Sequence, residues 1–268
     1  MEALTNGAKI NPTFQPRNNK EAYLAHLNGV DVGELPEPRT NEEALLCSLC
    51  VNGVGGGGVS DGLIIKQRDE NGSPLVVDAS NLSVLHTAQF YSGRANCPWY
   101  KTKTFILPKG ITELPEYVFA CCTGFETFEI PDGITKIGKY AFNICSGMKK
   151  VVFSDTVEEI GDHAFDKCTA LSEVVLNDNL RIIDDYAFKD CSALVSITIP
   201  QGVELIESYA FSGCTKLTTV TFEGTPAEIS SAAFLNLTNI TDIYVPWAEG
   251  EVSGAQWGAT NAIVHYGG

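Results

Sequence analysis

The stretch DYAFKDC at residues 185–191 places two aromatic rings, an alanine and a cysteine in one short run. Closely similar runs occur at KYAFNIC (139–145), DHAFDKC (162–168) and SYAFSGC (208–214). The phenylalanines of this run recur at a constant interval, each at i + 23 from the one before it, at Phe119, Phe142, Phe165, Phe188, Phe211 and Phe234. So regular a register predicts a fold built from stacked copies of one unit.

Each copy also contains a pattern typical of a short strand. Fourteen and twelve residues before each phenylalanine stand two apolar residues, for example Val151 and Phe153. Such alternation indicates a strand with one buried face. A further apolar residue, such as Ile160, indicates a core position on the return path. Because a unit as short as one repeat cannot bury these positions alone, we expect a solenoid with a parallel β-sheet and short helical or irregular return segments.

Residues 105–246 resemble the leucine-rich repeats of the BspA type, which occur in bacterial surface proteins and some parasites. The resemblance rests on the order of strand, turn and corner, with turns IPDGI at 130–134 and IPQGV at 199–203 followed by YAF-x-x-C. It implies a leucine-rich-repeat solenoid. Within each corner we expect the phenylalanine to fill the centre and the cysteine to act as a small buried apolar residue.

The ends of such a stack expose core residues and need covers. Residues 62–104 alternate short apolar runs with polar turns, so we expect strands and a degenerate first coil that cap the N-terminal end. Residues 247–268 are expected to cap the other end, with Trp247, Trp257 and Tyr266 covering the core. A carbohydrate-stacking site is the alternative interpretation of these rings.

Residues 1–52 differ in character from the repeats. The segments NNKEAYLAHLNG and TNEEALLCSLCVNG each indicate a short helix that begins at a polar cap. The apolar residues that we expect to make contacts on these helices are Tyr23, Leu24, Leu27, Leu45, Leu46 and Leu49. Two such helices are too short to be stable alone, which predicts a small helical module that assembles with other copies, as a homo-oligomer, or with another protein. The glycine-rich residues 53–61 are expected to be a linker rather than a phosphate-binding loop.

Two terminal segments carry a second resemblance. The pattern KEAYLAHLNG…LPEPRTNEEALLCSLCVNG is similar to the N-terminal module of phage and prophage virion proteins of gut Firmicutes. The segment YVPWAEGEVSGAQWGATNAIVHYG at 244–267 is similar to the end of leucine-rich-repeat proteins of the same prophages. This resemblance implies a modular particle protein in which residues 1–52 bind other virion proteins.

The composition narrows the class of partner. The chain has 33 acidic and 18 basic residues, a net charge of −15, which disfavours nucleic acid as a partner. No apolar stretch is long enough to insert in a membrane, and no secretory signal is visible. The cysteine count is odd, at nine, and we expect these thiols to be reduced.

We find no motif typical of catalysis. Cys47 and Cys50 have the spacing of a metal pair, but no second pair stands at a matching distance, and packing on a helix is the favoured interpretation. His163 replaces the tyrosine of neighbouring repeats. We therefore expect no enzymatic activity, no metal and no cofactor.

The repeats do offer a surface. The strand residue between the two buried ones should face outward, and we take as the candidate binding surface Glu129, Val152, Val175, Thr198, Thr221 and Tyr244. With strands about 4.8 Å apart, the full row of seven, which also includes Ile106, is roughly 29 Å long. It suits a protein or a glycan, although any β-sheet prefers threonine and valine at such positions.

These observations together lead to one functional hypothesis and one alternative. The hypothesis is a fibre or decoration protein of a phage or prophage virion, made in the bacterial cytoplasm, that displays the solenoid to a protein or glycan of the host surface. The alternative is a BspA-type adhesin on the bacterial cell surface.

Overall fold

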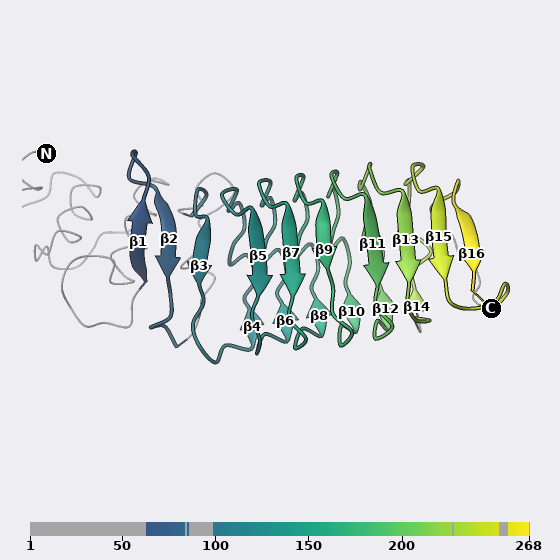
Figure 1. Cartoon of the computed structure of the whole chain (residues 1–268), viewed down its shortest axis with the longest axis horizontal. Coiled ribbons are helices and arrows are strands. Elements are labelled where there is room, and N and C mark those ends of the chain that lie inside the picture. The colour runs from purple at the N-terminus through teal and green to yellow at the C-terminus, as the bar shows by residue number, and fades with distance from the viewer. Residues whose placement is uncertain (1–62, 84, 86–98, 227, 252–256, 268) are drawn as a thin grey trace, which may run out of the picture.

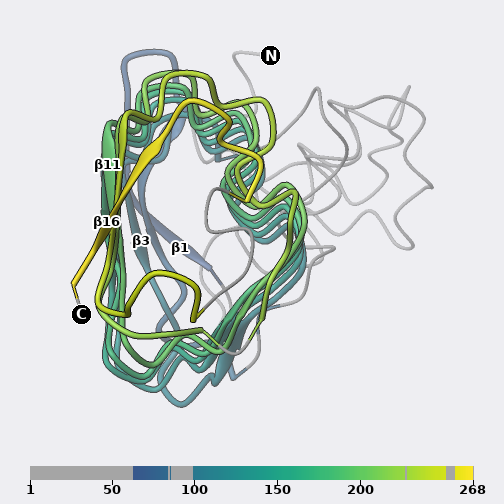
Figure 2. The same ribbon diagram turned by 90° about the vertical axis from the view of Figure 1, so that its right-hand side faces the viewer.

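A computed structural model describes residues 63–83, 85, 99–226, 228–251 and 257–267. The expected helical module at 1–52, with its candidate attachment residues, and the expected linker at 53–61 lie outside the described residues. The described chain winds into coils that follow one another along the long axis of the molecule (Figure 1). Seen along the stack, successive coils superpose closely (Figure 2), as a constant repeat length requires.

One side of every coil is a strand, and we call the row of these strands the ladder face. Its members after the N-terminal hairpin are β3 (Thr104–Ile106), β5 (Thr127–Ile130), β7 (Lys150–Phe153), β9 (Glu173–Val175), β11 (Ser196–Ile199), β13 (Thr219–Phe222), β15 (Asp242–Val245) and β16 (Ile263–Tyr266). Paired strands in this row run parallel. Paired residues within the repeats are one repeat length apart in the sequence, as Val151 and Val174 are. The position of a residue in its repeat therefore determines which residue lies beside it in the sheet.

The return path forms a second sheet, which the sequence did not predict. Its strands have two residues each: β4 (Glu113–Leu114), β6 (Lys136–Ile137), β8 (Glu159–Ile160), β10 (Ile182–Ile183), β12 (Leu205–Ile206) and β14 (Glu228–Ile229). They pair in parallel in one six-stranded sheet. Within the described residues the return segments contain no helix, so the helical alternative was wrong, and the segments are irregular only outside these short strands.

At the N-terminal end an antiparallel hairpin joins the stack. Strand β1 (Ile64–Arg68) pairs with β2 (Pro74–Asp78), and β2 pairs in parallel with β3, placing Val77 beside Phe105. Asp78 is buried and accepts from the Lys66 ammonium at 2.5 Å. Strand β2 therefore adds one parallel strand to the ladder face, and β1 lies outside it and runs in the opposite direction.

The C-terminal end is covered by two of the three expected rings. Trp247 and Trp257 are each 4% exposed, and their ring centroids lie 5.6 and 5.1 Å from that of Phe222. Tyr266 does not join them. It belongs to β16, which pairs with β15 and continues the ladder face, and it is 37% exposed.

The phenylalanines that define the repeat form a continuous column in the core. From Phe142 to Phe234 they are fully buried and stacked face to face, with centroids 5.0 to 5.5 Å apart. The alanine before each ring lets the next coil approach, and the Phe165 N–H donates to the Ala187 carbonyl at 2.7 Å. The columns thus join each coil to its neighbours only, as in other repeat proteins.

The cysteines that the structure describes are buried, and Cys168, Cys191 and Cys214 are free thiols, as expected for reduced cysteines. They also make a contact that we did not predict: the Cys191 Sγ lies 3.3 Å from the Phe165 carbonyl, and the Cys214 Sγ lies 3.1 Å from that of Phe188. A thiol is a weak donor, so this contact satisfies a carbonyl that would otherwise face an apolar core.

Each of the first five corners contains two residues in the left-handed backbone region. The aromatic residue has a φ near 55°, as in Tyr140 and His163, and four residues later Ile144 and Lys167 have φ values of 61° and 62°. Gly213 stands at the second of these positions in the fifth copy. Left-handed backbone strains residues that carry a Cβ atom, so most corners store strain that Gly213 avoids.

Candidate functional site

The ladder face places the candidate binding residues in one row, where they point away from the core. Glu129, Val175, Thr198 and Tyr244 are exposed, whereas Val152 and Thr221 are partly buried. The register sets Thr198 beside Thr221 and Thr221 beside Tyr244. The geometry therefore places all six on the ladder face as two runs of three, Glu129 to Val175 and Thr198 to Tyr244, and their role in binding stays a prediction.

A second outward row runs beside the first, one position before the buried residue of each strand. Ser196 lies beside Thr219, and Lys150 bridges to Glu173 at 2.5 Å. Val195, just before β11, is 49% exposed, and together with Val175 it gives the middle of the face an apolar surface. Hydroxyls and exposed aliphatic groups on a rigid sheet suit recognition rather than catalysis.

His265 is a member of this surface that the sequence reasoning missed. It follows Tyr244 in the row, and the two rings stack with centroids 4.5 Å apart. Its Nε2 lies 2.7 Å from Asp242 Oδ1. The pKa of Asp242 is lowered, first by the hydrogen bond from Thr241 and then by His265. The repeat pattern ends before residue 265, so only the observed pairing of β16 with β15 reveals this position.

The ladder face is interrupted twice. Strand β3 is the last strand of one sheet and β5 is the first strand of the next, so these two strands are not paired. A second break of the same kind separates β9 from β11. Inner residues beside the breaks are only partly buried, namely Leu107 at the first and Val174 and Leu176 at the second. The coils remain joined at both places by the return sheet, where β4 pairs with β6 and β10 with β12.

Proline contributes to both breaks. In a paired region, the Glu223 N–H donates to the Ile199 carbonyl of the preceding coil at 2.9 Å. Pro131 and Pro200 stand at the equivalent position in the coils that follow the breaks, and proline has no N–H to donate. Pro246 removes the same donor between β13 and β15, which nevertheless stay paired over three residues. The lost donor therefore weakens the ladder without being sufficient to open it.

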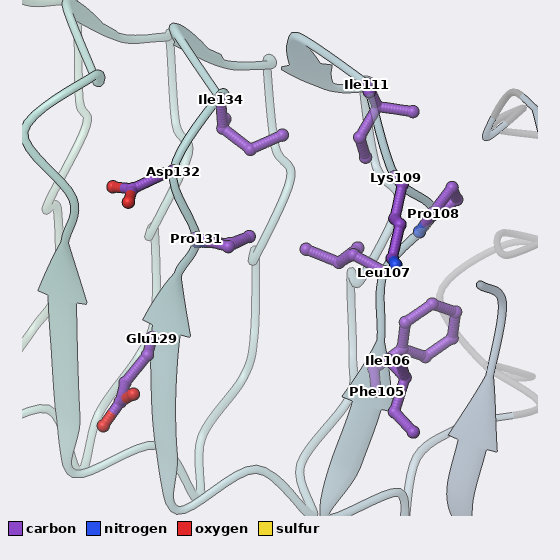
Figure 3. A pocket seen from close by; sticks show the side chains of 11 residues that line it. Phe105, Ile106, Leu107, Pro108, Lys109, Ile111, Glu129, Pro131, Asp132 and Ile134 are labelled. Carbon is purple, nitrogen blue, oxygen red and sulfur yellow. The ribbon is translucent and has the colours of Figure 1, made fainter.

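A pocket of about 430 Å³ lies at the first break (Figure 3). Its apolar lining comes from the segment that follows β3, with Leu107, Pro108 and Ile111, and from Pro131 and Ile134 beyond β5. The polar residues Lys109, Glu129 and Asp132 also line it, and Figure 3 shows the Glu129 and Asp132 side chains on the β5 side, with their carboxylates pointing away from Leu107. Glu129 thus belongs both to the candidate surface and to this pocket.

The described residues offer no arrangement suited to catalysis by a metal or a reactive thiol. None of the described His, Cys, Asp and Glu side chains form a group of three that could hold a metal ion. Burial raises the pKa of the Cys191 thiol well above its usual value, which disfavours the reactive thiolate. In the part of the chain that the structure describes, no helix could span a membrane.

Comparison with known families identifies the repeats. Residues 95–194 and 135–252 match the BspA type leucine-rich repeat region, in six copies. These overlapping matches cover more than half of the chain, which therefore belongs to the BspA-type leucine-rich repeat family. Leucine-rich-repeat solenoids are typically binding scaffolds rather than enzymes. The match does not extend to residues 1–94, so it does not support the resemblance of the N-terminal segment to phage particle proteins.

Several solved structures are similar to the chain, and their names describe leucine-rich proteins. A leucine-rich repeat protein from Bacteroides ovatus is 23% identical with a TM-score of 0.48, over 62% of this chain and 48% of that one. The leucine-rich repeat protein of T. pallidum is 21% identical with a TM-score of 0.46, over 75% and 77%. A leucine-rich cell surface protein from Faecalibacterium prausnitzii is 19% identical with a TM-score of 0.40, over 73% and 58%. The chain thus spans about half the length of the Bacteroides ovatus protein. No curated protein matches the chain.

Proposed function

We propose that the protein is a non-enzymatic binding protein that presents its ladder face to a protein or glycan of a host cell surface. The outward row from Glu129 to Tyr244 carries this proposal, because it offers a rigid surface of hydroxyl, aliphatic and aromatic groups over successive coils. Repeat proteins generally bind through such extended surfaces. Membership of the BspA-type family supports the same class of function.

We further propose that the chain is displayed on a phage or prophage particle, as a fibre or decoration protein. This part rests on the resemblance of the N-terminal segment to virion proteins and of residues 244–267 to leucine-rich-repeat proteins of the same prophages. In this arrangement residues 1–52 bind other virion proteins or other copies of the chain, and the solenoid projects outward. Display on a bacterial cell, as an adhesin, is the alternative; the name of the Faecalibacterium prausnitzii protein describes that kind of location.

Immunogold imaging of a source culture after prophage induction separates the two locations. Label on particles, at head or tail, is expected if the chain is a virion protein. Label confined to cell envelopes would refute the particle proposal and favour the adhesin.

A surface variant tests the ladder face itself. Replacing Val152, Val175 and Thr198 by glutamate should abolish binding of the labelled chain to host cells, because three charges would interrupt the row. The matched control carries Ile182→Glu and Leu205→Glu, at partly buried positions of the second sheet. If binding survived in the ladder variant and failed in the control variant, the binding surface would lie on the second sheet. That result would refute the proposal.

A further inference from the structure

We propose that the pocket between β3 and β5 binds an extended peptide through one large apolar side chain with a basic residue next to it. This inference rests on the proposed binding function and narrows the ligand at this site to protein. It concerns a different part of the molecule from the row of threonines, although Glu129 contributes to both.

The size and lining of the pocket suit an apolar side chain. Its volume of about 430 Å³ lies within the range of ligand sites, roughly 300–1,000 Å³. Leu107, Ile111 and Pro131 contribute aliphatic surface from both sides of the break, as Figure 3 shows. Leu107 is an inner residue of the repeat that the break leaves only partly buried, so an apolar occupant would complete the core at this rung.

Charge complementarity specifies the neighbouring residue. Glu129 and Asp132 lie on the β5 side of the pocket, and neither carboxylate is paired with a basic side chain in the ion pairs of the described residues. Lys109 lies on the opposite side. A long basic side chain, next to the apolar anchor and extended over β5, would therefore meet two carboxylates there, in a chain whose net charge is already −15.

The backbone adds an acceptor. Pro131 cannot donate to the Leu107 carbonyl in the way that Glu223 donates to Ile199, and no other donor among the described residues reaches that carbonyl. A peptide that lies along the break has N–H groups that can do so, which is the logic of recognition at an unpaired strand edge.

The same lining disfavours a glycan. Sugar rings bind to exposed aromatic faces and to side chains that satisfy many hydroxyls, whereas Phe105, the aromatic ring of the pocket, is 8% exposed. Aliphatic groups, two prolines and two carboxylates fit an apolar and basic peptide better.

The test uses the full chain and a fluorescein-labelled peptide of sequence Gly-Ser-Lys-Phe-Lys-Ser-Gly, followed by fluorescence anisotropy. Two control peptides carry Gly in place of Phe, or Glu in place of both Lys residues. The protein variant is Glu129→Lys with Asp132→Lys, which reverses the charge on the β5 side. Its control is Glu223→Lys, a charge reversal at an exposed position four coils further along the same edge of the ladder.

We expect saturable binding of the Lys-Phe-Lys peptide and loss of binding for both control peptides. The double variant should weaken the affinity at least about tenfold, since two exposed ion pairs are lost and replaced by repulsion, and Glu223→Lys should change it less than about twofold. No saturable binding, equal binding of the Glu peptide, or an unchanged affinity of the double variant would each overturn the inference. Host-cell binding that persists in those cases would leave the proposed function standing.

Discussion

Replacing Phe165 by alanine is expected to lower the free energy of unfolding by about 4 kcal/mol. The ring is fully buried, with stacked neighbours at 5.0 Å in Phe142 and 5.2 Å in Phe188. Truncating a buried phenylalanine costs about 3–5 kcal/mol. The two ring contacts favour the upper half of that range, since each aromatic pair contributes roughly 0.5–1.5 kcal/mol beyond its burial. Phe165→Leu keeps most of the apolar volume but loses both ring contacts, so it should cost about 1–3 kcal/mol, less than the alanine variant.

Urea unfolding followed by tryptophan fluorescence can report the two ends of the stack separately. The three tryptophans of the chain are Trp99, near the N-terminal cap, and Trp247 and Trp257 in the C-terminal cap. Trp99→Phe leaves only the C-terminal reporters, and the combined Trp247→Phe and Trp257→Phe variant leaves only the N-terminal one. Both reporters should show one midpoint in the chain that retains Phe165.

In the Phe165→Ala chain the two midpoints should separate. Each coil contacts only its neighbours, so a defect in the central coil weakens the coupling between the halves. A loss below about 2 kcal/mol would refute the role given to the phenylalanine column. Coincident midpoints in the alanine variant would refute the nearest-neighbour account of cooperativity.

Three further predictions concern charge, backbone and thiols. The ion pair with Lys66, helped by Ser80, lowers the pKa of Asp78 from 3.8 to about 2. The ionised Asp78 should therefore stabilise the fold fully above about pH 4, and this stabilisation should be lost as the pH falls through 2. In acid unfolding, the Asp78→Asn variant should lack the part of the pH dependence that comes from this carboxylate. Lys167→Gly should raise the free energy of unfolding by roughly 0.5–1 kcal/mol, because relief of left-handed strain exceeds the added entropy of the unfolded chain, and urea unfolding would show a lower midpoint if that balance is wrong. The Cys191 thiol, whose pKa is raised by burial, should react with a thiol reagent only in denaturant; rapid reaction in buffer would contradict its burial.

The sequence predicts the main sheet and its register because every copy places apolar residues at the same two strand positions. Val151 and Phe153 are buried as the alternation requires, and the phenylalanine column is continuous. The second sheet escaped prediction because its strands have two residues, such as Glu159 and Ile160, too few to show a period. A single apolar residue on a return path indicates burial but does not identify the backbone conformation.

The pocket could not be predicted from the repeat pattern, because the pattern treats all coils as equal. Leu107 occupies the position that is buried as Ile130 in the next coil, yet it lines the pocket. The available signal was Pro131, which lacks the N–H that Glu223 uses at the equivalent position. Since Pro246 has the same deficit beside paired strands, that signal indicates a weak point and does not decide whether the ladder opens there.

The constant offset between paired residues has a genetic consequence. Partners such as Val151 and Val174 stand one repeat length apart, and the ion pairs of Lys136 with Glu159 and Lys149 with Glu126 span the same interval. A tandem duplication of the codons for one repeat, anywhere between β5 and β13, adds one coil and preserves every contact on both sides. Recombination between copies can therefore lengthen or shorten the molecule in steps of one strand spacing, about 4.8 Å, without a new fold having to arise.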